Sequence, residues 1–204
     1  MMAATSLRVN LIVAVCDGSM GMGKDGGVPW RLLRELKQFA KLTSSTVDAS
    51  KRNAVLMGRK TWDSLPARAR PLRNRVNVVI SRSLAQLPSE TAELDAKHGS
   101  LTVLCSSYDE ALERVAAMGD AVESVWNIGG AQVYRLGLAH PTLYRVYMTR
   151  LYEHFECDTF FPNLDQLQLT DVTNSDSVDT PIVVGMQEEN GIKYQLFVYE
   201  RTRL

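Results

Sequence analysis

Short apolar runs alternate with amphipathic segments along most of the chain. Runs rich in Val, Ile and Leu predict strands at residues 7–15, 54–57, 76–80, 101–104, 122–128 and 143–151. Helical spacing of apolar residues predicts helices at 31–43, 58–64, 107–116 and 131–138, the third opened by the capping box Ser107–Glu110. Two more strands, near 167–173 and 193–200, follow with no helix between them.

This order of elements indicates the fold class. Strands that alternate with helices favour an α/β fold with a mainly parallel sheet, an antiparallel C-terminal edge and helices on both faces. The chain has 204 residues and no repeat or Pro/Gly/Ser linker, so we expect a single domain, 1–204. Ligands of such sheets bind at the carboxyl ends of the strands.

Composition and charge narrow the function. Lys plus Arg and Asp plus Glu both number 23, so the net charge is zero, which argues against a general nucleic-acid binder but not against binding of small anions. The longest apolar run, 11–16, is too short for a membrane span of about 20 residues. The three cysteines form no CxxC pair and the histidines no cluster. We therefore expect a reduced intracellular compartment, no disulfide framework and no metal site.

Glycines crowd the segment 17–29. Gly18 and Gly23-Lys24 have the spacing of a phosphate-binding P-loop, but Asp25 stands where that motif needs Ser or Thr. The segment is better interpreted as a mobile lid, with a passive surface loop as the alternative. Gly129-Gly130, between a strand and a helix, is either a phosphate site at a helix N-terminus or a tight turn that packing requires.

Two further turns combine basic and hydroxyl residues at strand ends. They are Gly58-Arg59-Lys60-Thr61 and Ser81-Arg82. Each alone is more often a solvated helix start. Together with Gly129-Gly130 they suggest separate anion sites for a dinucleotide that carries an additional phosphate.

Glu35 lies within the apolar stripe of the helix predicted at 31–43. On a helical wheel it falls between Phe39 and Leu42, away from the Lys and Arg residues. A carboxylate that faces a core is costly unless it is paired, protonated or functional. The alternative is an edge carboxylate that reaches solvent or bonds a neighbour.

Taken together, these residues and motifs resemble the dihydrofolate reductase family from about residue 7 to 203. The matching motifs, in the same order as in the family, are at 12–15, 23–30, 55–62, 70–72, 129–130, 158–162 and 191–194. The resemblance implies an eight-stranded sheet and an NADPH-dependent reductase of 7,8-dihydrofolate, with antifolates as inhibitors.

The resemblance also implies roles for individual residues. Glu35 would be the acid at the pterin site, with Thr149 hydrogen-bonded beside it. The lid would be 21–28, steadied by Asp158. Cofactor contacts would come from Ala14, Gly23, Gly58, Arg59, Lys60, Thr61, Ser81, Arg82, Gly129 and Gly130. Substrate contacts would come from Ile12, Val13, Leu36, Phe39, Leu72, Arg75 and Ile128, with Arg75 binding the glutamate α-carboxylate.

The sequence thus predicts a monofunctional cytoplasmic enzyme that acts as a monomer, with no nucleic-acid or membrane partner. Two alternatives stay open. A related reductase of another pterin or pyrimidine would have no use for Arg75 as a clamp for the substrate tail. A folate- or NADPH-binding protein without turnover would have no need for a buried acid such as Glu35.

Overall fold

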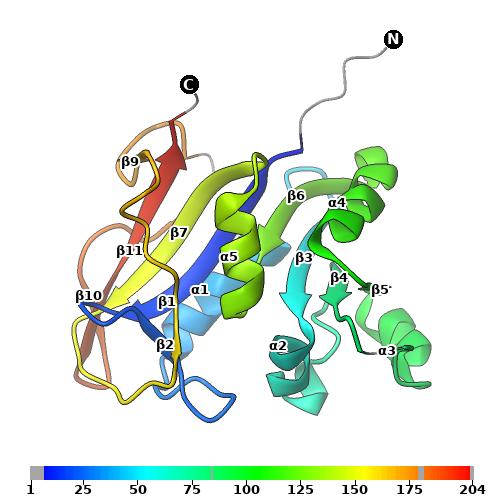
Figure 1. Ribbon diagram of the computed structural model, residues 1–204, viewed down its shortest axis with the longest axis horizontal. Helices are drawn as coiled ribbons and strands as arrows, with labels where there is room; N and C mark the ends of the chain where they lie inside the picture. The colour runs from blue at the N-terminus through cyan, green and yellow to red at the C-terminus, as the bar shows by residue number, and fades with distance from the viewer. Residues whose placement is uncertain (1–6, 84, 179–181, 203–204) are drawn as a thin grey trace.

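In the computed structural model, which describes residues 7–83, 85–178 and 182–202, one twisted sheet runs through the molecule (Figure 1). Its strand order is β10-β11-β7-β1-β6-β3-β4-β5, with β9 paired to the far end of β11. A second, two-stranded sheet joins β2 to β8.

The elements have the following bounds. The strands are β1 Val9–Cys16, β2 Gly21–Gly23, β3 Arg52–Gly58, β4 Arg75–Ile80, β5 Leu101–Cys105, β6 Val122–Asn127, β7 Leu143–Leu151, β8 Thr159–Phe160, β9 Leu169–Asp171, β10 Gln187–Glu189 and β11 Ile192–Arg201. The α-helices are α1 Leu33–Ser44, α2 Arg59–Ser64, α3 Thr91–His98, α4 Tyr108–Ala117 and α5 Ala131–Ala139, and two 3₁₀ turns cover Ala67–Ala69 and Gly119–Ala121.

The pairing confirms the predicted fold class. From β7 through β1, β6, β3 and β4 to β5, every neighbouring pair is parallel, because a helix or a long connection returns the chain each time. The C-terminal strand β11 is antiparallel to β7, β9 and β10. The parallel part therefore gathers the carboxyl ends of six strands along one edge of the sheet.

Helices cover both faces of the sheet (Figure 1). Helices α4 and α5 pack on one face through a core that includes Val9, Leu11 and Tyr134. On the other face, α1 and α2 contribute Leu42 and Trp62 to a second core. Side chains of β1 alternate between the two faces, as expected for a strand buried on both sides.

Besides the two 3₁₀ turns, four short elements were not predicted from the sequence. Three are the strands β2, β8 and β10, of two or three residues each, too short to show a period of two. The fourth is α3, whose buried residues are Thr91 and His98, so that it has no apolar stripe. The reciprocal half of the predicted capping box is also shifted by one residue: Ser107 Oγ accepts the N–H of Glu110, but the Glu110 carboxylate accepts the N–H of Ser106.

The predicted start of α1 and the predicted role of its stripe need correction. The helix begins at Leu33 and not at Arg31, because Leu32 is still extended, with φ −121° and ψ 99°. Leu33 and Leu36 do not face the core: they are 50% and 57% exposed. Only the C-terminal end of the stripe, at Leu42, is fully buried. The N-terminal half of α1 thus presents apolar side chains to solvent, which is typical of a ligand-binding surface.

Candidate active site

Glycine turns meet at the carboxyl ends of β3 and β6. The N–H of Gly58 donates a hydrogen bond of 2.7 Å to the carbonyl of Gly129. A Cβ at Gly58 would lie 3.2 Å from Val133, and a Cβ at Gly130 would lie 3.3 Å from Thr61 Oγ1, so side chains there would crowd their neighbours. The structure therefore brings together the predicted glycines, and it places bare backbone at the start of α5.

Asn127 holds the Gly129 turn from inside the fold. This fully buried side chain accepts a hydrogen bond of 3.0 Å from the Gly129 N–H and donates one of 2.9 Å to the carbonyl of Val133. Gly129 has φ 91°, and a Cβ on it would overlap the ring of Tyr134. The sequence analysis missed Asn127, although a polar residue at the end of an apolar strand, just before two glycines, was a usable signal.

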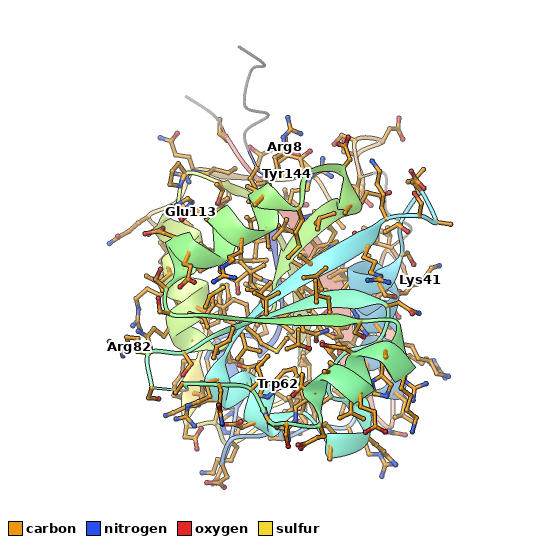
Figure 2. All side chains as sticks on the ribbon, turned by 90° about the vertical axis from the view of Figure 1, so that its right-hand side faces the viewer. Arg8, Lys41, Trp62, Arg82, Glu113 and Tyr144 are labelled. Atoms are coloured by element: carbon orange, nitrogen blue, oxygen red, sulfur yellow. The ribbon has the colours of Figure 1, made fainter. Side chains whose placement is uncertain are left out.

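The predicted phosphate-binding cations lie near these turns. Arg59 forms an exposed ion pair of 3.0 Å with Asp63 one helical turn away, and Lys60 is exposed beside it. Exposed pairs are worth about 0–1 kcal/mol, so a phosphate can compete with Asp63 for Arg59 at little cost. Ser81 is buried directly after β4, and the exposed Arg82 lies at the edge of the molecule in Figure 2.

The sheet divides next to these turns. Strand β1 pairs with β6 only as far as Leu11, but it stays paired with β7 to its own end. Where β1 and β6 part, the Tyr134 hydroxyl donates a hydrogen bond of 2.7 Å to the carbonyl of Ile12. Ile128 continues β6 on the other side of the division and donates its N–H to β3. Ile12 and Ile128 pack in one core, on the α1 face, as predicted for residues of one site.

Two neighbours in β1 point to opposite faces. Ala14 lies opposite Thr149 in the register with β7 and packs on the α1 face beside Trp30. The side chain of Val13 packs in the α4–α5 core, on the opposite face. Only the backbone of Val13 remains available to a ligand beside α1, so the predicted contact would have to be made by its N–H or carbonyl.

Glu35 and Thr149 come together as predicted. Glu35 is in the first turn of α1, and its Oε1 accepts a hydrogen bond of 3.3 Å from the Thr149 hydroxyl of β7. Burial raises the pKa of Glu35 to about 7; the Thr149 hydrogen bond opposes the shift and the nearby Glu189 carboxylate adds to it. Glu35 therefore exchanges a proton near neutral pH, as a general acid requires.

Glu189 of β10 controls the start of the Glu35 helix. The N-cap Leu32 has no side chain that can cap α1, and both oxygens of Glu189 accept N–H groups instead, from Leu33 and Arg34 at 2.9 Å each. The sequence analysis missed this residue. No local pattern could have revealed it, because 156 residues separate Glu189 from Leu33.

Arg75 lies at the other end of α1. This guanidinium is 7% exposed and donates hydrogen bonds to Thr43 Oγ1 at 2.7 Å and to the carbonyl of Arg73 at 2.9 Å. Its burial lowers its pKa to about 10. Within the described part of the chain, no carboxylate forms an ion pair with it. The buried Leu72 precedes it in the same connection, so the two predicted substrate residues lie close in the chain.

The glycine-rich segment after β1 is anchored to the distant strand β8. Strand β2 pairs with β8, and the carbonyl of Gly23 accepts the N–H of Asp158 at 3.0 Å. The Asp158 carboxylate in turn accepts the N–H of Asp25 at 2.8 Å. Asp158 thus makes the backbone contact predicted for a residue that steadies a lid.

The described residues hold neither a metal-ligating cluster nor a membrane-spanning helix. No group of three or more His, Cys, Asp and Glu side chains is placed to hold a metal ion. No helix in those ranges is long and apolar enough to cross a membrane.

A parallel α/β sheet whose carboxyl edge joins glycine turns and cations, with an acid of near-neutral pKa nearby, is typical of oxidoreductases that bind a dinucleotide. The family model described as dihydrofolate reductase matches residues 8–201. Dihydrofolate reductase of Drosophila melanogaster is 40% identical over 96% of this chain and 98% of its own length, and that of Gallus gallus is 39% identical over 96% and 97%. The Schistosoma mansoni enzyme structure superimposes with a TM-score of 0.78 at 30% identity, over 97% of this chain and all of that chain. The chain belongs to the dihydrofolate reductase family, and it reduces 7,8-dihydrofolate to tetrahydrofolate.

Proposed function

We propose that the electron donor is NADPH and that it binds along the carboxyl edge of β6, β3 and β4. Gly58, Gly129 and Gly130 would let its diphosphate approach the backbone, and Thr61 would donate a hydrogen bond to it. The close packing around these glycines supports this assignment, because a side chain at any of the three positions would fill the space beside the start of α5. When bound, NADPH supplies the hydride.

The cations would make the enzyme selective for NADPH over NADH. Arg82 and Ser81 would hold the 2′-phosphate that distinguishes NADPH from NADH, and Arg59 and Lys60 would neutralise the remaining phosphate charge. Exposed guanidinium and ammonium groups near a strand end suit this task, because they lose little hydration before the phosphate arrives. Gly23 and Ala14 would contact the nicotinamide end through their backbone.

The arrangement of groups along α1 is the observation that carries the substrate assignment. Glu35 is in its first turn, and Thr43, the partner of Arg75, is eight residues later, about 12 Å along the axis. Leu36 and Phe39 lie between them. A proton-holding acid, an apolar stretch and a buried cation that pairs with no carboxylate of the described residues match a pterin, a benzoyl ring and a glutamate in that order.

Glu35 would bind the amino group and N3 of the pterin. Thr149 orients the carboxyl group, and burial keeps its proton affinity high enough to hold a proton at neutral pH. A carboxyl group held at N3 does not reach N5, so water would carry the proton to N5 while C6 accepts the hydride. The backbone of Ile12 and Val13 and the side chain of Ile128 would line the same end of the substrate.

Arg75 would bind the α-carboxylate of the substrate's glutamate. Its planar guanidinium can donate two parallel hydrogen bonds, which lysine cannot. Thr43 and the Arg73 carbonyl use two of its five N–H groups, so others remain for a ligand. Leu72, close to Arg75 in the chain, would contact the benzoyl ring of the substrate. This clamp favours dihydrofolate over a pterin without a tail.

The decisive experiment measures substrate and cofactor together. Loss of the near-ultraviolet absorbance of NADPH should require both dihydrofolate and the protein, and Glu35→Gln should slow it by about 10²–10⁴ at neutral pH. Binding of both ligands without turnover would favour the binding-protein alternative. Equal rates with a tail-less pterin would favour a related reductase that has no use for Arg75.

We also infer that the enzyme is a cytoplasmic monomer that unfolds as one domain, binds antifolates competitively with dihydrofolate and does not bind nucleic acid. The zero net charge supports the absence of nucleic-acid binding, and the large sheet that runs through the molecule supports a single domain. Sedimentation of the purified chain, a single unfolding transition and displacement of dihydrofolate by an antifolate would test them; a dimer or two transitions would contradict the first two.

A further inference from the structure

Two thiols from distant parts of the chain meet beside the lid. Cys16 is the last residue of β1 and is 1% exposed, while Cys157 stands just before β8 and is partly exposed. Their side chains pack in the same core, and burial, together with the neighbouring Cys157, raises the pKa of the Cys16 thiol. Both are reduced, as is Cys105, which packs in a different core at the end of β5.

The surroundings hold the pair in place. The backbone of Phe155 and the side chain of Ser19 lie close enough to the Cys16 sulfur to oppose the rise in its pKa. Phe155 in turn packs edge-on against Trp30, with 5.5 Å between ring centroids, which fixes the segment before Cys157 against the sheet. The two thiols are therefore kept close by packing on both sides.

Cys157 also touches the lid strand itself. A Cβ at Gly21, the first residue of β2, would lie 2.7 Å from both Cβ and Sγ of Cys157. Gly21 pairs with Phe160 of β8, and Met20 accepts the N–H of Phe161 at 2.8 Å. The thiol pair thus lies where β1, the lid and the β8 segment join.

We propose that Cys16 and Cys157 form a reversible disulfide that ties the end of β1 to the β8 segment when a small disulfide such as oxidised glutathione accumulates. The Cys157 thiolate attacks one sulfur of that disulfide, so that a mixed disulfide forms and one glutathione thiolate leaves. The Cys16 thiolate then attacks Cys157 Sγ and displaces the second. The two protein thiols lose two electrons and two protons, and the glutathione disulfide gains both.

The order of attack follows from exposure. Cys157 is the more accessible thiol, whereas burial raises the pKa of Cys16 and keeps it protonated for most of the time. Cys16 is therefore a poor target for the oxidant and serves as the resolving thiol. The reduced form persists while glutathione is mainly reduced.

The new bond would change the lid. With Cys157 fixed to β1, the β8 segment can no longer move away from the sheet, and β2 keeps its pairing with it. This consequence rests on the proposed role of 21–28 as a lid, whereas formation of the disulfide does not. Oxidation should therefore lower kcat several-fold by slowing lid motion, with little effect on the KM for dihydrofolate.

Thiol counting tests the bond directly. The full chain is incubated with oxidised glutathione, quenched with acid and digested without reduction. We expect two of the three thiols to disappear, a peptide that joins Cys16 to Cys157, and full recovery with dithiothreitol. Cys105→Ser, the matched control, should still lose two thiols. Cys16→Ser should stop at the mixed disulfide on Cys157. A bond to Cys105, or glutathione retained on Cys157 in the wild-type chain, would overturn the proposal.

The rate of dihydrofolate reduction by the oxidised protein tests the consequence separately. A several-fold fall in kcat that dithiothreitol reverses, and that Cys16→Ser does not show, would support the coupling to the lid. An unchanged kcat in a chain shown to carry the disulfide would refute that coupling. Neither result depends on whether Glu35 is the acid, because the same chain is compared in its two redox states.

Discussion

Replacing Glu35 with glutamine should make the empty enzyme more stable and less active. Burial raises the pKa of Glu35 to about 7 from its ordinary 4.5. Below pH 4.5 the carboxyl is protonated in both folded and unfolded chains. Between 4.5 and 7 the folded chain still holds the proton and the unfolded chain has lost it, so this contribution to stability is lost as pH rises. At about 1.4 kcal/mol per pH unit, the loss reaches about 3 kcal/mol above pH 7.

Glutamine is neutral at every pH, so the variant does not lose this contribution to stability as pH rises. Urea unfolding without ligands should therefore show Glu35→Gln and wild type nearly equal at the acid end, and the variant more stable by up to about 3 kcal/mol at pH 8. The value is an upper bound, because Glu35 is only partly buried. As a control, Glu113→Gln changes an exposed carboxylate on α4 (Figure 2) and should show no such dependence. If the difference in free energy of unfolding between wild type and Glu35→Gln were the same at all pH values, Glu35 would not have a raised pKa in the folded chain.

Three further substitutions test the cofactor, the substrate tail and the lid. Arg75→Leu should weaken dihydrofolate binding by about 2–5 kcal/mol in a fluorescence titration and barely affect an antifolate without a glutamate, because only the former offers a carboxylate to the buried guanidinium. Arg82→Ala should raise the KM for NADPH and leave that for NADH nearly unchanged, since only NADPH has the 2′-phosphate. Asp158→Ala, which removes the acceptor of the Asp25 N–H, should slow single-turnover hydride transfer while the free energy of unfolding changes by no more than about 0.5 kcal/mol.

Each of these has a distinct contrary result. Equal losses for both ligands in Arg75→Leu would make Arg75 a fold-supporting residue that holds Thr43, and Arg73→Leu, an exposed neighbour, controls for the lost charge. An unchanged NADPH preference in Arg82→Ala would move the 2′-phosphate site to Arg59 and Lys60. A large loss of stability at an unchanged rate in Asp158→Ala would make the loop contact purely structural.

The elements that the sequence predicted well are those whose signal is local. Strand 143–151 was predicted at the bounds it has, because its apolar side chains pack on both faces of a central strand. The strands β2 and β8 each consist of two or three residues and exist only because they pair with each other across 136 to 139 positions of the chain. No window of sequence contains that partner. Helix α3 escaped for a different reason: its buried residues are polar.

The same distinction applies to the site. Glu35 stood out because a charge within an apolar stripe is a local anomaly, and the glycine turns because they follow strands. The stripe itself misled as a guide to the core, since Leu33 and Leu36 belong to its apolar side and are exposed. The spacing of apolar residues predicts which side of a helix is apolar, but it does not predict what packs against that side. Here the apolar face extends beyond the core, and the exposed part is the part that we assign to the substrate.

The helix that carries Glu35 also shows why part of the chemistry lies outside the local sequence. α1 has no side-chain cap of its own, and Glu189 of β10 accepts its first two free N–H groups. That carboxylate fixes where the helix starts, and therefore where Glu35 meets Thr149. Its negative charge also contributes to the raised pKa of Glu35. One residue at the antiparallel edge of the sheet thus acts on both the position and the proton affinity of the acid. An acidic residue in a short strand near the C-terminus is ordinary in sequence, and only the folded chain shows that Glu189 caps the helix that carries Glu35.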